Sequence, residues 1–477
     1  MSSDPAGIHV VIIGAYGSAG VAVAEGLLDA PDVRMTLIDD GEPGGGLCIL
    51  KGCMPSKEVI SAGAHRYHAR ADHRLVGEPP ALDLDAVYET KQEHVLGFAK
   101  HRRAAVNQMA DRDDVRFIHD TARFIGPRTI AAGDERIEAD YIVIATGSTV
   151  NIPPLPGIDD VDYMTSADVL DATNVPDSGI VMGFGYVGLE LVPYLAEAGV
   201  DLTVIEHDDR PLDEADPAFG DTILELYRQE FGIEILTNTD ERSVAPTADG
   251  GVELTVERDW GLEMIEADQL YLFTGRTPNV AGLDLDRAGL TCSPDWVRET
   301  MQSTDDDCIF IVGDANWKEP ILHVAKEQGY KAAENILAHC AGDPLEPYEN
   351  ITHHVVFTGL GVYPYVRIGH TDASASVLNR ETVTVTREAT SDGIFKSKHV
   401  PHGHATLVVD QAEGTVLGYQ GLHHHADVMA KTMQVIIELG LDVRNIPDRA
   451  FHPTTPELLD GLFREASASV EENLSAQ

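Results

Sequence analysis

Cysteine is scarce in this chain. The 477 residues contain five cysteines, at positions 48, 53, 292, 308 and 340. Five are too few for the disulfide-rich scaffold of a small secreted protein. Cys292, Cys308 and Cys340 are isolated and are predicted to be ordinary buried thiols. Cys48 and Cys53 form a close pair, and in a reducing compartment such a pair is more often catalytic or metal-binding than structural.

Long apolar segments are also missing. No run of eighteen apolar residues occurs, so a membrane-spanning helix is not predicted. The first segment, MSSDPAGIHVVIIGAYGSAG, has no basic flank and leads directly into a strand-like stretch, which is not typical of a signal peptide. We therefore expect a cytoplasmic protein with no membrane partner.

The chain also contains few basic residues. The chain has 34 basic and 79 acidic residues, a formal net charge of −45. The acidic residues are spread along the chain, and such a surface keeps a protein hydrated through charge repulsion. Nucleic acid requires a basic face, so a nucleic-acid partner is not expected. The charge is similar to that of proteins from halophilic cells, where molar salt screens repulsion over about 3 Å.

Glycine motifs are what the sequence does contain. SGIVMGFGYVGLELVPYLAEAGVDLTVIEHDD (178–209) is typical of a strand, a G-x-G-x-x-G turn, a helix and a second strand. In such a turn, Gly183 permits the tight bend, Gly185 lets a pyrophosphate approach the backbone, and Gly188 allows close packing of helix and strand. Glu206, at the end of the second strand, completes the pattern of a dinucleotide-binding unit.

A similar but irregular unit begins the chain. HVVIIGAYGSAGVAVAEGLL (9–28) predicts a strand, a turn and an Ala-rich helix, and VRMTLIDD (33–40) a second strand. The turn glycines are Gly14, Gly17 and Gly20, with one residue more than usual between the first two. Asp39 lies where an acid would hold ribose hydroxyls.

The last part of the chain has another pattern. HATLVVDQAEGTVLGYQGLH (404–423) predicts two strands around a Glu-Gly turn, and ADVMAKTMQVIIELGL (426–441) has helical periodicity. SASVEENLSAQ (467–477) is expected to be a polar, frayed end. The neighbouring histidines at 353–354 and 423–425 are expected to be solvated surface residues.

The cysteine pair in GGGLCILKGCMPSK (44–57) has three competing interpretations: a structural disulfide, ligands of a metal site, and a redox-active disulfide. Residues five apart on an ideal helix are displaced by about 7.5 Å along its axis. A disulfide needs Cα atoms within about 7 Å, so Cys48 and Cys53 can bridge only where the helix is distorted. Zinc requires four ligands and no second cysteine pair exists, so no metal site is predicted.

These segments together resemble the flavoprotein disulfide reductases with two nucleotide domains, the family of dihydrolipoamide dehydrogenase, glutathione reductase and mercuric reductase. GGGLCILKGCMPSK is similar to the family's redox-active C-x-x-x-x-C segment. IVIATGSTVNIPPLPG (142–157) and FTGRTPN (273–279) are similar to the crossings between its nucleotide domains. CIFIVGD (308–314) is similar to its flavin-contacting strand and FHPTTPE (451–457) to its terminal His-Pro-Thr-x-x-Glu. The irregular first turn and a lengthened segment at 355–369 depart from the family's pattern.

The resemblance implies an α/β fold with two Rossmann-like domains and an α+β C-terminal domain that forms a homodimer. The FAD domain would comprise residues 1–150 and 278–347, the NAD(P) domain 151–277 and the dimerisation domain 348–477. The implied cofactors are FAD and, because of the acid at Glu206, NAD(H) rather than NADP(H). The residues expected to bind them are Gly14, Gly17, Gly20, Asp39, Gly45, Ala145, Thr146, Gly147, Gly183, Gly185, Tyr186, Gly188, Glu206, Gly275, Arg276 and Asp314.

The resemblance also implies catalytic roles. Cys53 would face the flavin and Cys48 would exchange with the substrate. His452 of the partner chain would be the base, oriented by Glu457. Lys57 and Glu190 would pair near the flavin and tune it electrostatically.

The implied substrate is a lipoyl group or another small dithiol or disulfide. A glutathione-reductase-like enzyme using NADPH and a non-catalytic subunit of a 2-oxoacid dehydrogenase complex are the alternatives. Mercuric reductase is disfavoured, because such enzymes use further C-terminal cysteines and no cysteine follows Cys340.

Overall fold

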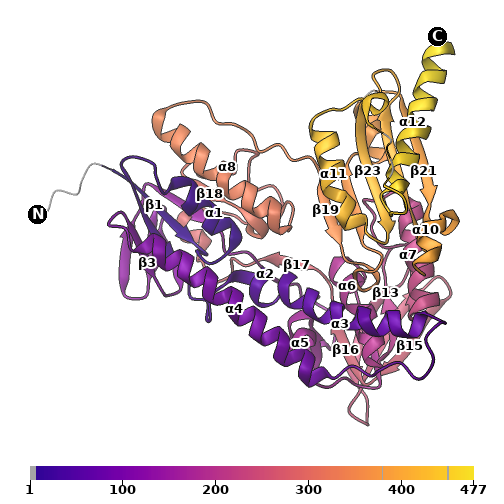
Figure 1. Ribbon diagram of the computed structural model, residues 1–477. Helices are drawn as coiled ribbons and strands as arrows, with labels where there is room; N and C mark the ends of the chain where they lie inside the picture. Colours follow the sequence, from indigo (N-terminus) through magenta and orange to yellow (C-terminus); the bar gives the residue numbers. More distant parts are fainter. Residues whose placement is uncertain (1–6, 379, 448, 450, 477) are drawn as a thin grey trace, which may run out of the picture. The chain divides into compact units, whose positions relative to one another are not determined.

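The computed structural model of the protein describes residues 7–378, 380–447, 449 and 451–476 (Figure 1). The chain forms two compact units, each made of three stretches. Unit 1 comprises Met1–Pro55, Glu89–Asn151 and Arg276–Asn350. Unit 2 comprises Ser56–Tyr88, Ile152–Gly275 and Ile351–Gln477. The predicted division into three domains stays a prediction.

A parallel sheet with the order β18-β7-β1-β2-β3 forms the centre of unit 1. Its strands are β1 (Ile8–Ile13), β2 (Val33–Ile38), β3 (Val115–Ile118), β7 (Tyr141–Ile144) and β18 (Ile309–Ile311). The apolar sequences of β1 and β7 suit strands that are buried on both faces. The order of β3, β2, β1 and β7 is that of a mononucleotide-binding half.

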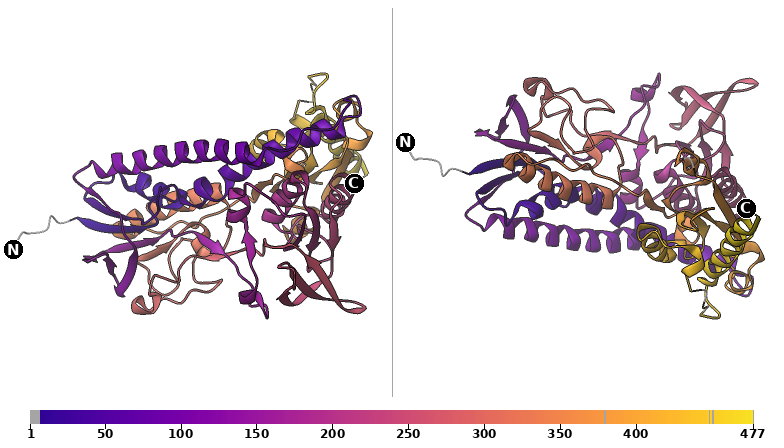
Figure 2. Two further views of the ribbon diagram at one scale, coloured as in Figure 1. Left: turned by 90° about the horizontal axis from the view of Figure 1, so that it is seen from below. Right: turned by 90° about the horizontal axis from the view of Figure 1, so that it is seen from above.

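Two helices, α1 (Ser18–Leu27) and α8 (Leu322–Ala341), lie side by side against this sheet (Figures 1 and 2). Small residues allow the close approach. A Cβ added at Gly329 would lie 2.5 Å from the carbonyl oxygen of Ala19, and one at Gly26 would lie 2.7 Å from the Cβ of Ala333. The Ala- and Gly-rich sequence of α1 is therefore a packing requirement.

The remaining elements of unit 1 are peripheral to the sheet. A small antiparallel sheet contains β4 (Ala122–Gly126), β5 (Thr129–Ala132) and β6 (Glu135–Glu138), and β8 (Ser148–Val150) pairs with β17 (Arg276–Pro278). The short helix α2 (Gly46–Leu50) precedes α3 (Cys53–Ala71). Both α3 and α4 (Leu84–Ala110) begin in one unit and end in the other.

Unit 2 contains a second parallel sheet, with the order β12-β11-β10-β16-β9. Its strands are β9 (Tyr163–Thr165), β10 (Ser178–Met182), β11 (Asp201–Ile205), β12 (Glu234–Leu236) and β16 (Gln269–Leu272). Three helices, α5 (Ser166–Asp171), α6 (Tyr186–Ala198) and α7 (Pro217–Glu230), accompany it. An antiparallel sheet is formed by β13 (Asp240–Pro246), β14 (Val252–Arg258) and β15 (Gly261–Ala267).

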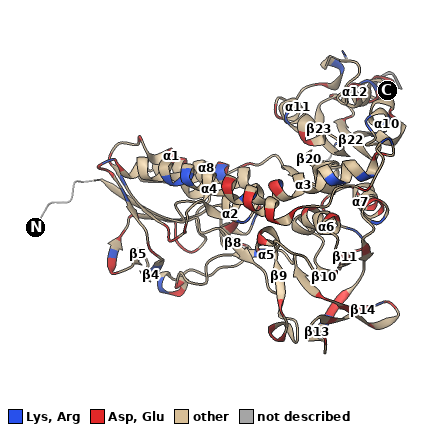
Figure 3. Ribbon diagram, turned by 60° about the horizontal axis from the view of Figure 1, so that its bottom comes forward, with Lys and Arg blue, Asp and Glu red and all other residues tan. Residues whose placement is uncertain are grey.

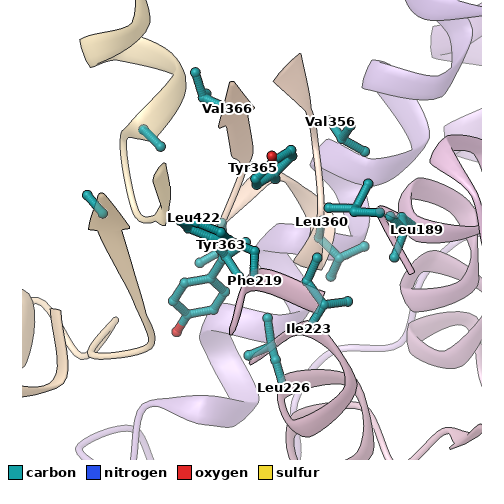
Figure 4. Close-up of a cluster of buried hydrophobic side chains, with 14 of the residues drawn as sticks. Leu189, Phe219, Ile223, Leu226, Val356, Leu360, Tyr363, Tyr365, Val366 and Leu422 are labelled. Atoms are coloured by element: carbon teal, nitrogen blue, oxygen red, sulfur yellow. The ribbon is translucent and has the colours of Figure 1, made fainter. Parts of the chain in front are cut away.

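The other large sheet of unit 2 is antiparallel, with the order β19-β20-β23-β22-β21. Its strands are β19 (His353–Val356), β20 (Tyr365–Gly369), β21 (Thr382–Glu388), β22 (Gly403–Asp410) and β23 (Val416–His423). The helices around it are α9 (Asp372–Ala375), α10 (Gly393–Ser397), α11 (Ala426–Glu438) and α12 (Glu457–Ala476). Its core is continuous with that of α6 and α7 through Leu189, Phe219, Leu360 and Tyr365 (Figure 4).

Most of the predicted elements are confirmed. Both βαβ units, the hairpin at 404–423 and the helix at 426–441 are present. The expectation of a frayed C-terminal end is wrong, because α12 continues to Ala476. Leu462, Ala466 and Val470 of this helix are fully buried at a spacing of four residues, so packing holds the helix in place as far as Val470.

The acidic residues are distributed over many elements and do not gather in one segment (Figure 3). Over the described part of the chain, every helix is too short or too polar to span a bilayer.

Candidate active site

The first glycine turn connects β1 to α1. Gly14 has φ +95°, and a Cβ there would lie 2.3 Å from the carbonyl oxygen of Ala145. A Cβ at Gly20 would lie 2.3 Å from the carbonyl oxygen of Gly14. Helix α1 has Gly17 at its N-cap, three residues after Gly14. Glycine is therefore required at the bend and at the contact between helix and turn.

The second glycine turn repeats this geometry in unit 2. Gly183 has φ +93°, and a Cβ at Gly188 would lie 2.6 Å from the carbonyl oxygen of Gly183. Gly185 is the N-cap of α6, and no atom of the described residues lies within 4 Å of a Cβ built on it. This open space lies where a pyrophosphate would approach the backbone.

An acid follows the second strand of each unit. Asp39 accepts hydrogen bonds from the backbone N–H groups of Tyr16 and Gly41, both at 2.8 Å. Glu206 accepts one from the N–H of Asp208 at 3.0 Å. Burial raises the pKa of both carboxyl groups, more than the N–H donors lower it. Both acids lie directly after the second strand of their unit, and their role in ribose recognition stays a prediction.

The two cysteines lie on either side of a helix break. Helix α2 ends at Leu50, Lys51 has φ −141° and ψ 12°, and α3 begins at Cys53. The distortion that a bridge between the two cysteines would require lies at Lys51 and Gly52, between the two helices. Both side chains are in the thiol form and are not joined by a disulfide. The Cys48 thiol is hydrogen-bonded to Cys53, and this bond, with burial, raises the pKa of Cys48.

Two adjoining cavities of unit 1 connect the first glycine turn with the cysteines. One, of about 330 Å³, is lined by Gly14, Asp39 and Thr146. The other, of about 160 Å³, is lined by both cysteines, Gly45, Arg276 and Asp314. The residues lining both cavities include Gly17, Gly46, Ala145 and Gly147. Asp39 therefore lines one cavity and Asp314 lines the other, and glycines line both. This arrangement suits a dinucleotide whose ribose hydroxyls contact one acid and whose ribityl chain contacts the other.

A hydrogen-bonded chain fixes Asp314 in the second cavity. Ser148 Oγ donates to Asp314 Oδ2 at 2.6 Å. Arg276 Nε donates to Ser148 Oγ at 2.8 Å, and its Nη2 donates to the Ser148 carbonyl oxygen at 2.7 Å. Burial lowers the pKa of Arg276. Sequence reasoning did not single out Ser148, although its place directly after the Ala-Thr-Gly segment was a usable signal.

Lys57 and Glu190 form an ion pair in unit 2. Lys57 Nζ lies 2.7 and 2.6 Å from the two carboxylate oxygens of Glu190. The Phe357 N–H donates to the same carboxylate at 3.1 Å, and Lys57 Nζ lies 4.5 Å from the centre of the Phe357 ring. The structure thus brings together two residues that are more than a hundred positions apart.

Tyr186 and Gly275, two further residues predicted to bind a nucleotide, both lie in unit 2, and their role stays a prediction. The Tyr186 hydroxyl donates to Glu214 Oε1 at 2.7 Å, while the residue remains 39% exposed. Burial of the hydroxyl, followed by the nearby Glu214 charge, raises the pKa of Tyr186. Gly275 has φ +85°, and no described atom lies within 4 Å of a Cβ built on it.

His452 and Glu457 form a dyad before α12. His452 Nδ1 lies 3.1 and 3.2 Å from the two carboxylate oxygens of Glu457. The N–H of Thr454 donates to Glu457 Oε1 at 3.0 Å, and this bond, followed by His452, lowers the pKa of Glu457. The His452 side chain is 75% exposed. Its ring is therefore oriented by the carboxylate through Nδ1, which leaves Nε2 directed to the surroundings.

The expectation of solvated neighbouring histidines is wrong for two of the five. His354 and His423 are buried, because they lie in the strands β19 and β23. The one group of metal-type side chains found in the described residues is Asp72, His73 and His399, whose ligand atoms lie within 4.8 Å of one another. Arg74 already binds the Asp72 carboxylate through Nε and Nη2.

Comparison with known proteins identifies the family. The model of the pyridine nucleotide-disulphide oxidoreductase family matches residues 8–332. The chain belongs to this family. The model of the family's dimerisation domain matches residues 354–462. The family uses FAD and a nicotinamide nucleotide, so the predicted resemblance is confirmed.

Two groups of relatives are similar to the same extent. A mercuric reductase of Shigella flexneri is 29% identical over 473 residues, which cover 95% of this chain and 79% of the relative. A dihydrolipoyl dehydrogenase of Haloferax volcanii is 28% identical over 470 residues, 94% of each chain. Sequence identity alone does not separate their activities.

Solved structures confirm the predicted α/β fold. The HOCl-induced flavoprotein disulfide reductase RclA of Escherichia coli matches with a TM-score of 0.81 at 22% identity, over 96% of this chain and 99% of that one. LpdA of Mycobacterium tuberculosis matches with a TM-score of 0.80 at 23% identity, over 96% and 99%.

Proposed function

We propose that the chain is an FAD-dependent disulfide oxidoreductase that transfers electrons between NAD(H) and a small dithiol or lipoyl substrate. The observation that carries the proposal is the contact of Cys48 with Cys53 across a helix break, in the wall of a glycine-lined cavity. The chain has the two nucleotide turns and a His-Glu dyad that this reaction needs. These features also argue against a non-catalytic subunit.

The residues of unit 1 suit FAD. The cofactor's pyrophosphate would lie at the glycine turn before α1, its ribose at Asp39 and its ribityl chain at Asp314. When bound, FAD supplies the transfer of an electron pair between the nicotinamide and the cysteine pair. The side chains that would hold it include Arg276 and Ser148, whose hydrogen bonds fix the Asp314 carboxylate.

The two sulfurs would have different tasks. A substrate thiolate attacks Cys48 Sγ of the oxidised pair, and Cys53 leaves as a thiolate. The second substrate thiol then breaks the mixed disulfide and releases Cys48, and the substrate leaves as a disulfide with two electrons left on the cysteine pair. As the resemblance to the family implies, we assign the stable thiolate to Cys53, the sulfur that would face the flavin.

A base is needed because the substrate thiol must lose its proton before it attacks. His452 is the proposed base. Glu457 binds Nδ1 and so directs Nε2 toward the proton. The high exposure of His452 suits a residue that acts in the site of a partner chain, and a homodimer is the expected assembly.

The dithiol substrate is preferred to a metal ion substrate, although mercuric reductases are similar relatives. Residues 341–477 contain no cysteine that could deliver mercuric ion to the site. A glutathione-reductase-like activity with NADPH is the second candidate. Glu206 disfavours it, because a carboxylate would repel a 2′-phosphate.

Cysteine variants test the proposal. Cys48→Ser should leave Cys53 as a thiolate beside oxidised flavin, visible as a long-wavelength absorption band, and Cys53→Ser should lack the band. Both should lose turnover of lipoamide and of small disulfides but keep reduction of the flavin by NADH. Cys292→Ser, a cysteine outside the cavities, is the matched control. A band in Cys53→Ser and not in Cys48→Ser would contradict the assignment.

A histidine variant tests the base. His452→Gln should keep flavin reduction near the wild-type rate, measured by stopped flow. Its turnover should fall roughly 10²–10⁴-fold, because the loss concerns proton transfer. Wild-type turnover in this variant would remove His452 from the mechanism.

A further inference from the structure

Two histidines and an aspartate meet in unit 2, outside the two cavities of the candidate active site. Asp72 and His73 directly follow α3, and His399 lies between α10 and β22, more than three hundred positions later in the chain. One ligand atom of each residue lies within 4.8 Å of those of the other two. The fold therefore brings together two imidazoles and a carboxylate that no local motif connects.

The two imidazole rings have a separation typical of ligands that share one metal ion. The ring centres of His73 and His399 lie 5.1 Å apart, and the ring planes are inclined by 54°. Two imidazoles that each hold a nitrogen about 2.1 Å from a tetrahedral zinc ion have ring centres about 5 Å apart. Neither ring has a hydrogen-bond partner among the described residues. A nitrogen of each ring can therefore turn toward one ion without breaking a contact.

The Asp72 carboxylate supplies the third ligand. Three atoms within 4.8 Å of one another have a common point at most about 2.8 Å from each, compared with about 2.0–2.2 Å for zinc bound to histidine or carboxylate. Rotation of surface side chains covers this small difference. Hydrogen bonds from Arg74, followed by the nearby His399, lower the pKa of Asp72, so the carboxylate is ionised as a metal ligand must be.

Arg74 is the competing partner of this carboxylate. Its Nε and Nη2 lie 2.8 and 2.6 Å from the two carboxylate oxygens of Asp72. The Arg74 side chain is 58% exposed, and ion pairs in contact with solvent are weak. An ionised carboxylate also has about four lone-pair sites, so one oxygen can bind a metal ion while the other keeps the guanidinium.

Both chain segments that carry the ligands are held in place within unit 2. Near the end of α3, Arg70 Nε donates to Glu197 Oε1 at 2.7 Å. On the other side of the group, Phe395 and Val400 are buried, and the N–H of Val400 donates to the carbonyl oxygen of Phe395 at 3.1 Å. The backbone next to His399 is thus anchored, which suits a metal site that needs fixed ligand positions.

We propose that Asp72, His73 and His399 bind a divalent transition-metal ion such as Zn²⁺, which joins the end of α3 to the segment before β22. Two imidazole nitrogens and one carboxylate oxygen suit Zn²⁺ and its neighbours, whereas Mg²⁺ and Ca²⁺ prefer oxygen ligands alone. Three protein ligands leave a fourth position to water. The site is independent of the proposed redox reaction.

Calorimetric titration with Zn²⁺ tests this site. The untagged FAD-loaded protein is used with its Cys48–Cys53 pair oxidised, so that neither a tag nor these thiols bind the metal. Excess Mg²⁺ is present throughout to occupy the weak sites that a chain of net charge −45 offers to any cation. We expect one Zn²⁺ per chain to bind under these conditions.

Substitutions within the group assign the ligands. His73→Ala and His399→Ala should each weaken binding at least about 10–100-fold, since the loss of even an outer partner of a metal ligand has this effect. Asp72→Asn should also weaken it. Arg74→Gln should strengthen it, because the carboxylate loses its competing cation. His65→Ala removes an exposed histidine from α3 itself and, as the matched control, should bind like wild type.

Hydrogen exchange provides a second measurement. Zn²⁺ should slow exchange in residues 68–75 and 396–403 of the wild type but not of His399→Ala, because the ion joins these two segments. Zinc binding that survives the double substitution of His73 and His399 overturns the inference, since the ion then lies elsewhere. So does a lack of binding when Mg²⁺ is present, or equal weakening in His65→Ala. Unchanged circular dichroism and flavin absorbance show that a variant that loses zinc is still folded.

Discussion

The two nucleotide turns of this chain differ by one residue and share almost everything else. Gly14 and Gly183 have nearly equal φ values, +95° and +93°. Gly20 and Gly188 each approach the carbonyl oxygen of the first glycine of their turn. The insertion therefore leaves the packing of helix on strand intact.

The inserted Tyr16 adds two backbone groups that the second turn lacks. Its N–H donates to Asp39 and its carbonyl oxygen accepts from Arg102, whereas Gly185 faces open space. A strand-turn-helix unit can thus keep its packing contacts and still acquire new polar links. The comparison separates the glycines that hold the turn together from the residues that connect it to the rest of the site.

The largest expected effect comes from the packing glycines. Gly20→Ala places a Cβ at 2.3 Å from a backbone oxygen, and Gly188→Ala places one at 2.6 Å. Such overpacking costs about 1–3 kcal/mol and displaces the turn. Gly20→Ala should be purified with little flavin. Gly188→Ala should keep its flavin but show an NADH KM raised at least about tenfold.

Absorbance at the flavin band and steady-state kinetics measure these two losses separately. Gly97→Ala on α4, where no described atom lies near the added Cβ, is the control and should be neutral. Full flavin content in Gly20→Ala would contradict this prediction. It would show that the first turn, unlike the second, does not depend on the contact between its third and first glycines.

The acids after β2 and β11 should act on different cofactors, the first on the flavin and the second on the nicotinamide nucleotide. Glu206→Arg should move the ratio of NADH to NADPH efficiency toward NADPH by about 10- to 100-fold, because hydrogen bonds to a charged group contribute about 1.5–3 kcal/mol. Asp39→Asn should weaken flavin retention and leave that ratio unchanged. Measurements of kcat/KM with both nucleotides decide the question. A wild-type protein that strongly prefers NADPH would contradict the role of Glu206.

A smaller difference concerns acid stability. Burial lowers the pKa of His404 and of His423 to about 4, and both lie in the antiparallel sheet of unit 2. A histidine with a lowered pKa stabilises the fold fully above its unfolded pKa of about 6.5, and this contribution is lost as the pH falls toward 4. The free energy of unfolding should fall by up to about 1.4 kcal/mol per pH unit for each histidine.

Hydrogen exchange at pH 7 and pH 5 tests this prediction. Amides of β22 and β23 should lose protection at pH 5 to a greater extent than those of β1 and β7. His404→Gln should reduce the difference. Equal losses in all four strands would show that the buried histidines do not set the acid response.

Local signals predicted the parts of the site that are close in sequence. The glycine turns, the cysteine pair and the His452–Glu457 dyad each fit within one short segment. The Lys57–Glu190 pair was found because the resemblance supplied a contact that no spacing encodes. Such patterns work because turn geometry and helix packing restrict which residues fit.

Non-local contacts that the resemblance did not supply could not be predicted. Arg102 has no signal in its own segment, since its partner is a backbone carbonyl group created by an insertion far upstream. The helix break at Lys51 and Gly52 depends on the packing of α2, which the sequence pattern does not reveal. The C-terminal segment was predicted to fray because it is polar. Its helix is nevertheless buried on one face, because an apolar residue at every fourth position, as at Ala466 and Val470, is enough to bury that face.

The exposed His452 has a genetic consequence. If each site combines the cysteines of one chain with the His-Glu dyad of the other, two inactive chains can rescue each other. Mixing Cys48→Ser chains with His452→Gln chains would give hybrid dimers in which one site inherits Cys48 from one parent and His452 from the other. Random reassortment would restore about a quarter of the wild-type sites. Complementation between two null alleles would thus become a property of this fold.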